Sequence, residues 1–197
     1  MNFLQKTKLK KNLAISNKGN DYTLSEKFIN LLMVDGKKVK AYNIFYETLK
    51  CLEEKNMVSF GFTVPTVSGT AGTAAVSLNS VDSASINKQK NVILALNILF
   101  IAVLNVKPSV EVRKVRKGAI TYLVPAIVPI KRQETLAIRW LIEAAKNRKK
   151  KSKLSFAECL AIEFTEAYKK LGKPRQRRDD THKLAESNRA YIRFRWW

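Results

Sequence analysis

The chain combines a large excess of positive charge with enough hydrophobic residues to fold. Its 197 residues include 37 Lys and Arg against 16 Asp and Glu, a formal net charge of +21, and 46% of them are hydrophobic. The hydrophobic share excludes a disordered polycation. Because self-repulsion at this charge destabilises a free compact protein, the composition predicts a polyanionic partner.

The composition also argues against membrane, metal and secretory functions. The longest apolar run, residues 92–104, is far shorter than the ~20 residues of a membrane-spanning helix. Cys51 and Cys159 have no Cys or His at metal-ligand spacing, so we expect no metal site, no disulfide framework and a reducing compartment. The basic first 20 residues lack the apolar core of a secretory signal and the arginines of a transit peptide, so we expect no targeting segment.

The positive charge lies mainly in the second half of the chain. Residues 105–197 carry 24 Lys and Arg against 9 acidic residues, and they contain all eleven arginines. Arg binds phosphates with two parallel N–H groups and stacks on bases, so this half is the expected binding region. Residues 56–88 are instead rich in Ser, Thr, Gly and Ala, which predicts a flexible insertion, and residues 1–20 are predicted to form a basic arm.

Helical patterns occupy the first part of the chain. Thr23 and Glu26 have capping-box spacing and open a helix that ends before Asp35-Gly36. A second helix is predicted from about Val39 to Lys55 by its apolar face. Residues 91–104 are apolar almost all round, which predicts a central buried helix.

The next stretch changes from helical to strand periodicity. Residues 109–125 read as a β-hairpin that turns at Gly118 and is closed off by Pro125 and Pro129. Along one side of the first strand, valines give way to basic residues such as Lys114. We therefore expect the base of the hairpin to pack on the body and its basic tip to project.

The remaining residues return to helical periodicity. A helix begins near Arg132 and gives way to a basic loop over residues 147–153. Ser155 and Glu158 form a second capping box, and the helix that they open ends at residues 171–174.

A last helix is predicted to follow the basic residues 175–178, with Asp179 and Asp180 at its N-terminus. The predicted fold is mainly α, a bundle of about six helices with a protruding basic β-hairpin arm. Residues 21–55 and 89–197 form its single domain.

No catalytic site is expected. His182 is the only histidine, and Asp180 is its one nearby carboxylate in the sequence. The phosphate-binding glycine loops and the zinc-protease motif are missing, and the paired carboxylates look like helix-end charges. The sequence therefore predicts no catalytic residue, no metal ligand and no cofactor.

Basic residues form three clusters that alternate with aromatic side chains. The clusters are Lys114, Arg116 and Lys117 on the hairpin, residues 148–153, and Arg175, Arg177 and Arg178. Together with the aromatic residues near the end of the chain they favour nucleic-acid binding. Clusters spread over a hairpin, a loop and a tail suit a folded RNA better than the single recognition helix of a DNA-binding helix-turn-helix.

Several stretches resemble the small-subunit ribosomal protein seven family of the bacterial and organellar type. They are KFINLLMVDGKK (27–38), NVKPSVEV (105–112), TYLVP (121–125), TLAIRWLIEAA (135–145), RDDTH (178–182) and AESNRA (185–190). The resemblance covers residues 21–55 and 89–197, and the first 20 residues match weakly. It implies a helical body with a projecting hairpin.

The resemblance also implies a function and a set of contacts. It implies primary binding to the 3′ major domain of small-subunit rRNA, organising the subunit head beside neighbouring head and platform proteins. The hairpin would lie near the exit-site tRNA and the mRNA exit path. The expected RNA contacts are Lys37, Lys38, Arg113, Lys114, Arg116, Lys117, Lys131, Arg132, Arg139, Lys173, Arg175, Arg177, Arg178, Arg193 and Arg195, and the charge pattern adds Arg148 and Lys149.

Two stretches of the sequence indicate the type of organism and the compartment from which the chain comes. The Arg-Trp-Trp ending and residues 133–137 look most like mitochondrial members from plants and algae. We expect an organelle-encoded protein of the mitochondrial ribosome, with a plastid or bacterial home as the alternative. The rival functions are an RNA-processing enzyme or another nucleic-acid binder with a generic basic surface. Binding to anionic membranes is disfavoured, because no helix pairs a basic face with an exposed aromatic one.

Overall fold

A computed structural model describes residues 24–59 and 82–197 of the chain. The predicted basic arm of residues 1–20 and the part of the predicted insertion between residues 60 and 81 lie outside this range. The described elements are α2 (Leu24–Leu32), α3 (Lys38–Ser59), α4 (Asp82–Val106), β1 (Val110–Lys117), β2 (Ile120–Ile127), α5 (Ile130–Lys151), α6 (Phe156–Tyr168), α7 (Lys173–Ser187) and the 3-10 helix η1 (Arg189–Phe194). They confirm a mainly α fold with a β-hairpin arm.

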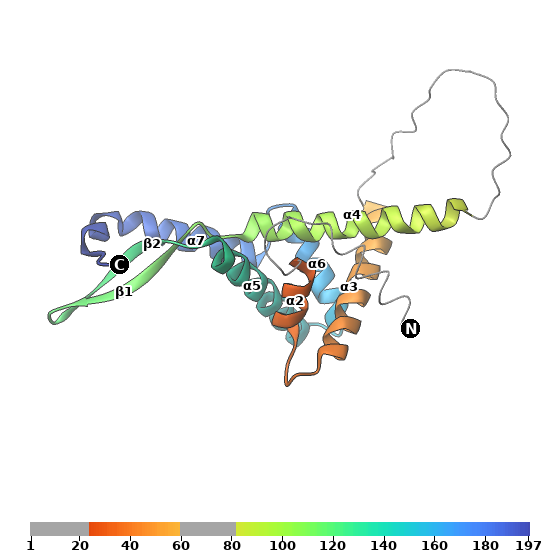
Figure 1. Cartoon of the computed structure of the whole chain (residues 1–197), viewed down its shortest axis with the longest axis horizontal. Coiled ribbons are helices and arrows are strands. Elements are labelled where there is room, and N and C mark those ends of the chain that lie inside the picture. Colours follow the sequence, from red (N-terminus) through yellow and green to blue (C-terminus); the bar gives the residue numbers. More distant parts are fainter. Residues whose placement is uncertain (1–23, 60–81) are drawn as a thin grey trace, which may run out of the picture.

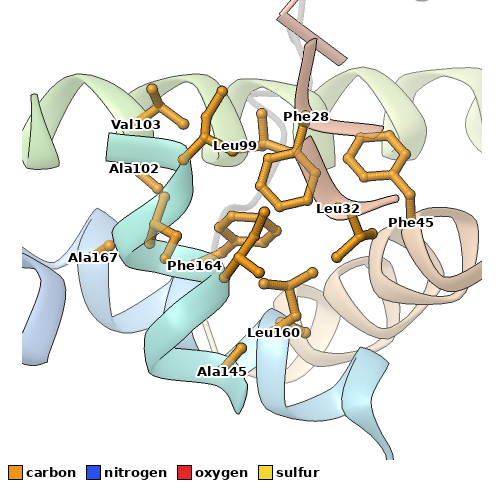
Figure 2. Close-up of a cluster of buried hydrophobic side chains, with 14 of the residues drawn as sticks. Phe28, Leu32, Phe45, Leu99, Ala102, Val103, Ala145, Leu160, Phe164 and Ala167 are labelled. Atoms are coloured by element: carbon orange, nitrogen blue, oxygen red, sulfur yellow. The ribbon is translucent and has the colours of Figure 1, made fainter. Parts of the chain in front are cut away.

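The helices pack around α6, which contacts α3, α4 and α5. Phe164 of α6 is fully buried, and its ring centroid lies 5.5 Å from that of Phe28 on α2. Phe28 in turn lies 5.5 Å from Phe45 of α3, so three rings join three helices (Figure 2). Tilted ring pairs at this distance add to the free energy gained by burying the rings.

The turn between α2 and α3 lies where the sequence predicts it. Asp35 and Gly36 have positive φ angles of 52° and 70°, which only Gly and short polar residues adopt readily. The helices on the two sides of the predicted insertion both extend into it. Helix α3 continues to Ser59, and α4 already begins at Asp82. These extra turns contain no Gly or Pro to end them.

Helix α4 is buried on one face only, so the prediction of a centrally buried helix is wrong. Its buried side carries Ala95, Leu99 and Ala102, whose exposed fractions are 0 to 1%. The opposite side exposes Leu94, Phe100, Ile101 and Leu104. In Figure 1, α4 lies along one edge of the helical body, where the neighbouring helices reach only its inner face.

The predicted basic loop of residues 147–153 is wrong over its first part, because α5 continues through Lys151. Four basic residues occupy the last turn of α5, where cations interact favourably with the negative end of the helix dipole. The capping box of α6 is confirmed. Ser155 Oγ accepts a hydrogen bond from the Glu158 backbone N–H at 3.2 Å, and the Ser155 N–H donates to Glu158 Oε2 at 3.1 Å.

Strands β1 and β2 form an antiparallel ribbon that projects from the body (Figure 1). Gly118 has a positive φ of 66° in the two-residue turn, as a type II′ turn requires at its first central position. Pro125 does not close the ribbon as predicted, because it pairs with Val112 and β2 continues to Ile127. Both strands of a two-stranded ribbon are edge strands, which tolerate the missing N–H of proline.

The last helix begins earlier than predicted. Helix α7 starts at Lys173, with Pro174 in its first turn, so the basic residues 175–178 lie on the helix and not before it. Proline suits this position because its missing N–H is not needed there. After Ser187 the chain forms η1, which lies against β2.

Candidate nucleic-acid interface

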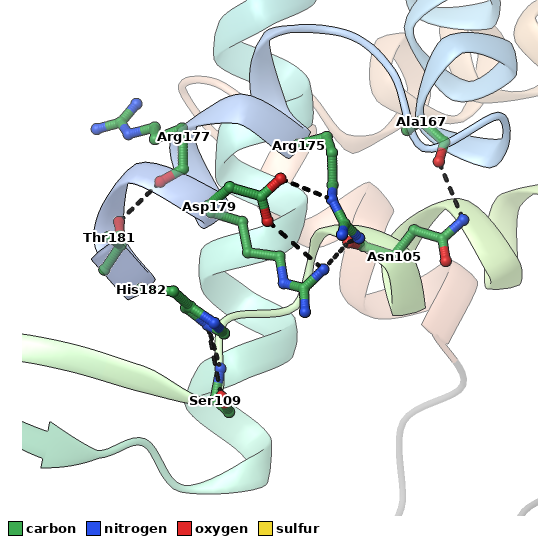
Figure 3. Close-up of polar contacts among 9 residues, drawn as sticks. Asn105, Ser109, Ala167, Arg175, Arg177, Asp179, Thr181 and His182 are labelled. Atoms are coloured by element: carbon green, nitrogen blue, oxygen red, sulfur yellow. Dashed lines mark hydrogen bonds and ion pairs between the residues drawn. The ribbon is translucent and has the colours of Figure 1, made fainter. Parts of the chain in front are cut away.

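A half-buried polar junction holds the base of the hairpin to three helices (Figure 3). The Asn105 carbonyl oxygen, near the end of α4, accepts hydrogen bonds from Arg175 Nη1 at 2.9 Å and from Arg178 Nη1 at 3.3 Å. The Asn105 side chain donates to the carbonyl oxygens of Ala167 and Tyr168 at 3.1 Å each. These bonds satisfy carbonyl groups that the ends of α4 and α6 leave without helical partners.

Asp179 offsets part of the positive charge of the two arginines in this junction. Its carboxylate lies 3.1 Å from Arg175 Nε and 3.8 Å from Arg178 Nη1. Burial lowers the pKa of Arg178, the neighbouring Arg175 lowers it further, and Asp179 opposes both. The RDDTH motif therefore contributes to the structure of the junction, which its charge alone did not indicate.

His182 joins α7 to the start of the hairpin. Its Nε2 accepts the Ser109 backbone N–H at 3.2 Å, so this nitrogen carries no proton (Figure 3). Burial lowers the pKa of His182, and the positive charges of Arg178 and Arg175 lower it further. The negative charge of Asp179 acts in the opposite direction but does not cancel these effects. The ring is therefore held neutral and acts as a hydrogen-bond acceptor.

A second carboxylate fixes the first residues of the arm. Glu111 accepts hydrogen bonds from Arg132 Nε at 2.8 Å and Arg113 Nε at 2.9 Å, and its side chain is only 14% exposed. Burial works to raise the pKa of Glu111, but the bonds from Arg132 and Arg113 outweigh it and hold this pKa below its ordinary value. Both arginines are exposed, so each keeps part of its guanidinium toward solvent.

Sequence reasoning missed a third carboxylate, which links α2, α5 and the entry to the arm. Glu134 accepts hydrogen bonds from Lys27 Nζ at 2.9 Å and from Lys107 Nζ at 3.0 Å. Burial opposes ionisation of Glu134, yet the two lysines together hold its pKa below the ordinary value. Neither lysine belongs to a charge run, so no local signal marked them.

Arg148 is half-buried, and its guanidinium binds carboxylates of the protein itself. Its Nε donates to Glu163 at 2.7 Å and its Nη2 to Glu166 at 2.6 Å, joining the end of α5 to α6. The Glu163 side chain is 2% exposed, so burial raises its pKa while Arg148 counteracts that effect. Arg177 also has a carboxylate partner, Glu143 of α5, at 2.5 Å.

The other predicted contacts point to solvent. Every residue of the predicted set is exposed except the half-buried Arg148, Arg175 and Arg178. Lys37 lies 3.6 Å from the exposed carboxylate of Asp35. The residues that make no salt bridge with a described carboxylate are Lys38, Lys114, Arg116, Lys117, Lys131, Arg139, Lys149, Lys173, Arg193 and Arg195.

The structure brings the hairpin and the last residues of the chain together into one surface. Tyr122 of β2 lies 5.2 Å from Tyr191 and 4.7 Å from Phe194, measured between ring centroids. Lys117 Nζ lies 4.6 Å from the Phe194 ring, and the Arg193 guanidinium lies 5.4 Å from the same ring. We call the hairpin and residues 189–197 together the arm–tail surface. Its aromatic contacts are long-range, so the sequence did not show that the two basic regions meet.

A helical body that fixes a cationic, aromatic-lined arm is the architecture of a structural nucleic-acid-binding protein. No helix within residues 24–59 or 82–197 is long and apolar enough to cross a membrane. In the same residues, no group of three His, Cys, Asp or Glu side chains lies close enough together to hold a metal ion.

Comparison with known proteins identifies the family. The model of ribosomal protein S7p/S5e matches residues 4–189, and the chain therefore belongs to this family. The small ribosomal subunit protein uS7m of Prototheca wickerhamii is 43% identical over 88% of this chain and 89% of its own length. The uS7m of Marchantia polymorpha is 37% identical over 91% of this chain and 62% of its own length. The bacterial uS7 of Dichelobacter nodosus is 41% identical, over 86% and 85% of the two chains.

These matches confirm the resemblance that the sequence motifs indicated. Proteins of this family are structural components of the small ribosomal subunit, so the prediction that the chain is not an enzyme is confirmed. The family includes mitochondrial and bacterial forms. The match begins at residue 4, so it also includes most of the first 20 residues, and it ends before the last eight residues of the chain.

Proposed function

We propose that the protein is a primary binder of the 3′ major domain of small-subunit rRNA, where it organises the subunit head. The observation that carries this proposal is the arm–tail surface, on which unpaired cations are held beside aromatic rings. Lys114 and Lys117 face solvent there without a carboxylate partner among the described residues. Such cations bind RNA phosphates with little competition from the protein itself.

The exposed cations and the half-buried ones have different proposed roles. We assign phosphate contacts to the exposed residues of the predicted set. The half-buried Arg148, Arg175 and Arg178 instead position the elements that carry those contacts, because their guanidinium groups already bind protein oxygens. The projection of the ribbon supports a position near the exit-site tRNA and the mRNA exit path, with head and platform proteins as neighbours (Figure 1).

We further propose the mitochondrial ribosome as the site of action, with the gene encoded in the organelle. The two uS7m relatives support this location. The bacterial uS7 relatives support the alternative of a bacterial or plastid home.

Binding to the cognate 3′ major domain RNA at ~200 mM salt tests the proposal. Duplex DNA and an unrelated structured RNA serve as competitors, because generic electrostatic binding is weak at this salt concentration. We expect the cognate complex to persist. Equal loss to all three nucleic acids would show that the positive charge acts without specificity.

A pair of charge-matched variants tests the arm itself. Lys114→Ala with Lys117→Ala removes two positive charges from the arm, and Lys40→Ala with Lys50→Ala removes two from α3, where Lys50 pairs with Glu54. The arm variant should lose affinity and reduce the slope of log K against log salt by about 2, roughly one for each lost phosphate contact. Equal effects of the two variants would count against an arm contact.

A further inference from the structure

Trp196 is a large apolar side chain that the fold leaves exposed to solvent. Its exposed fraction is 82%, the highest among the exposed large hydrophobic residues of the described chain. The match to the family model ends at residue 189, before Trp196. Because most of the ring stays in water, its burial contributes little to stability, and its faces are open to a partner.

Trp196 has a fixed neighbour on one side. Its ring packs against Trp197 in an edge-to-face arrangement, with centroids 5.8 Å apart and planes at 88°. The Arg113 guanidinium lies 5.3 Å from the Trp197 ring on the arm side. Arg195 Nε donates to the Trp197 carbonyl oxygen at 3.2 Å. The last two residues are therefore attached to β1, while most of the Trp196 indole stays accessible.

Two arginines accompany Trp196 in the tail, Arg193 three residues before it and Arg195 directly before it. Arg193 and Arg195 are exposed, and neither pairs with a described Asp or Glu side chain, although Arg195 Nε bonds to the Trp197 main-chain oxygen. An exposed aromatic ring with arginines close to it along the chain suits a base and its flanking phosphates. Only an unpaired base offers a free face, since bases in a duplex are stacked on both sides.

We propose that Trp196 is a stacking platform for an unpaired base of single-stranded RNA, with Arg193 and Arg195 binding the phosphates on either side of that base. This role rests on the RNA-binding function proposed above. It adds a contact to base faces, which the phosphate contacts of the arm do not provide. The contact is tolerant of sequence because every base has a π face.

The test measures binding of the full chain to a short unstructured oligoribonucleotide, to its abasic counterpart and to a blunt RNA duplex. Trp196→Ala should weaken binding to the unstructured RNA by about 5-fold to 100-fold, the range that loss of one base stack produces. The salt dependence should not change, because no phosphate contact is lost. Binding to the abasic strand and to the duplex should match that of the unmodified protein.

Two further variants control for the size and position of the substitution. Trp196→Phe keeps an aromatic face and should retain most of the affinity. Leu184→Ala removes another exposed apolar side chain, on α7, and should change nothing. Binding of the unmodified chain should also quench tryptophan fluorescence, and Trp196→Ala should remove much of that quenching.

The stacking role is overturned if Trp196→Ala binds all three ligands as the unmodified chain does, or weakens all three equally. It is also overturned if the unmodified chain binds rRNA but not the unstructured strand. If the unmodified chain binds neither the rRNA domain nor any oligonucleotide, the proposed RNA-binding function itself fails. Loss of a ribosomal-protein contact in Trp196→Ala with RNA affinity unchanged would assign the ring to a protein partner instead.

Discussion

Two basic regions of this molecule use their positive charge in opposite ways. At the contact between α5 and α6, Arg148 is shared between Glu163 and Glu166 and holds the two helices together. On the arm, Lys114 and Lys117 extend into solvent, and the nearest ring or strand neighbours carry no negative charge. A run of basic residues therefore indicates an RNA surface only where the fold does not supply the opposing carboxylates.

The energetic consequences of losing charge differ in the same way. Removing one partner of a buried ion pair leaves the other charge without compensation, which costs several kcal/mol. Removing an exposed lysine has little effect on stability, because water solvates the charge in both the folded and unfolded states. Stability and RNA affinity should therefore respond to different substitutions.

The largest expected effect belongs to Arg148. Arg148→Ala should lower the free energy of unfolding by about 3 kcal/mol, since the carboxylate of Glu163 would stay buried without its cation. The loss should shrink toward acid pH, because the raised pKa of Glu163 makes its neutral form accessible in the folded state. Urea unfolding at several pH values measures both effects.

Two matched variants sharpen this comparison. Lys149→Ala changes the next residue, which is exposed, and should leave stability nearly unchanged. Adding Glu163→Gln to Arg148→Ala should restore part of the lost stability, because no buried charge then remains. A stability loss of the same size in Lys149→Ala would contradict the distinction between paired and exposed cations.

A smaller effect is expected from the contact between arm and tail. Tyr191→Ala removes a ring that lies 5.2 Å from Tyr122, and it should lower stability by about 1 kcal/mol. RNA affinity should fall too, because the cations of the hairpin and of the tail are no longer held together. Tyr191→Phe keeps the ring and should behave as the unmodified chain. Thermal unfolding measures the effect on stability, and rRNA binding measures the effect on affinity. Unchanged affinity in Tyr191→Ala would show that RNA binding does not require the tail to be attached to the hairpin.

The smallest expected effect is the pH dependence from His182. Because its folded-state pKa lies below the ordinary value of about 6.5, its contribution to stability is complete above that value. The contribution is lost as the pH falls through the lowered folded-state pKa, where protonation removes the acceptor of the Ser109 N–H. His182→Gln keeps an acceptor that does not titrate, so the difference in unfolding free energy between the two proteins should change below about pH 6.5. A constant difference from pH 8 to pH 5 would remove His182 from this role.

Local signals predicted most of the elements. The capping box at Ser155, the turn at Gly36 and the glycine of the hairpin each act over a few residues, and the structure contains all three. The run of residues 147–151 was predicted as a loop because charge runs are common in loops, but Lys and Arg also extend a helix at its C-terminus.

Tertiary structure determines which side of α4 is buried and which carboxylates the arginines bind. An apolar helix such as residues 91–104 has no polar face to show which side is covered. Nothing in the sequence therefore indicated that Phe100 would be exposed. The partners of Arg132, Arg148 and Arg177 lie 21, 15 and 34 residues away in the sequence. Composition counts such charges without showing which ones the fold neutralises.

The junction at Asn105 has a consequence for how the chain reaches its final shape during synthesis. The hairpin leaves the translating ribosome before α7, yet Arg175, Arg178 and His182 supply the bonds that fix its base. An isolated two-stranded ribbon is only marginally stable in water. The residues of α2, α3, α4, α5 and α6 all precede these residues in the chain, so the arm takes its orientation last, when residues 173–197 are released.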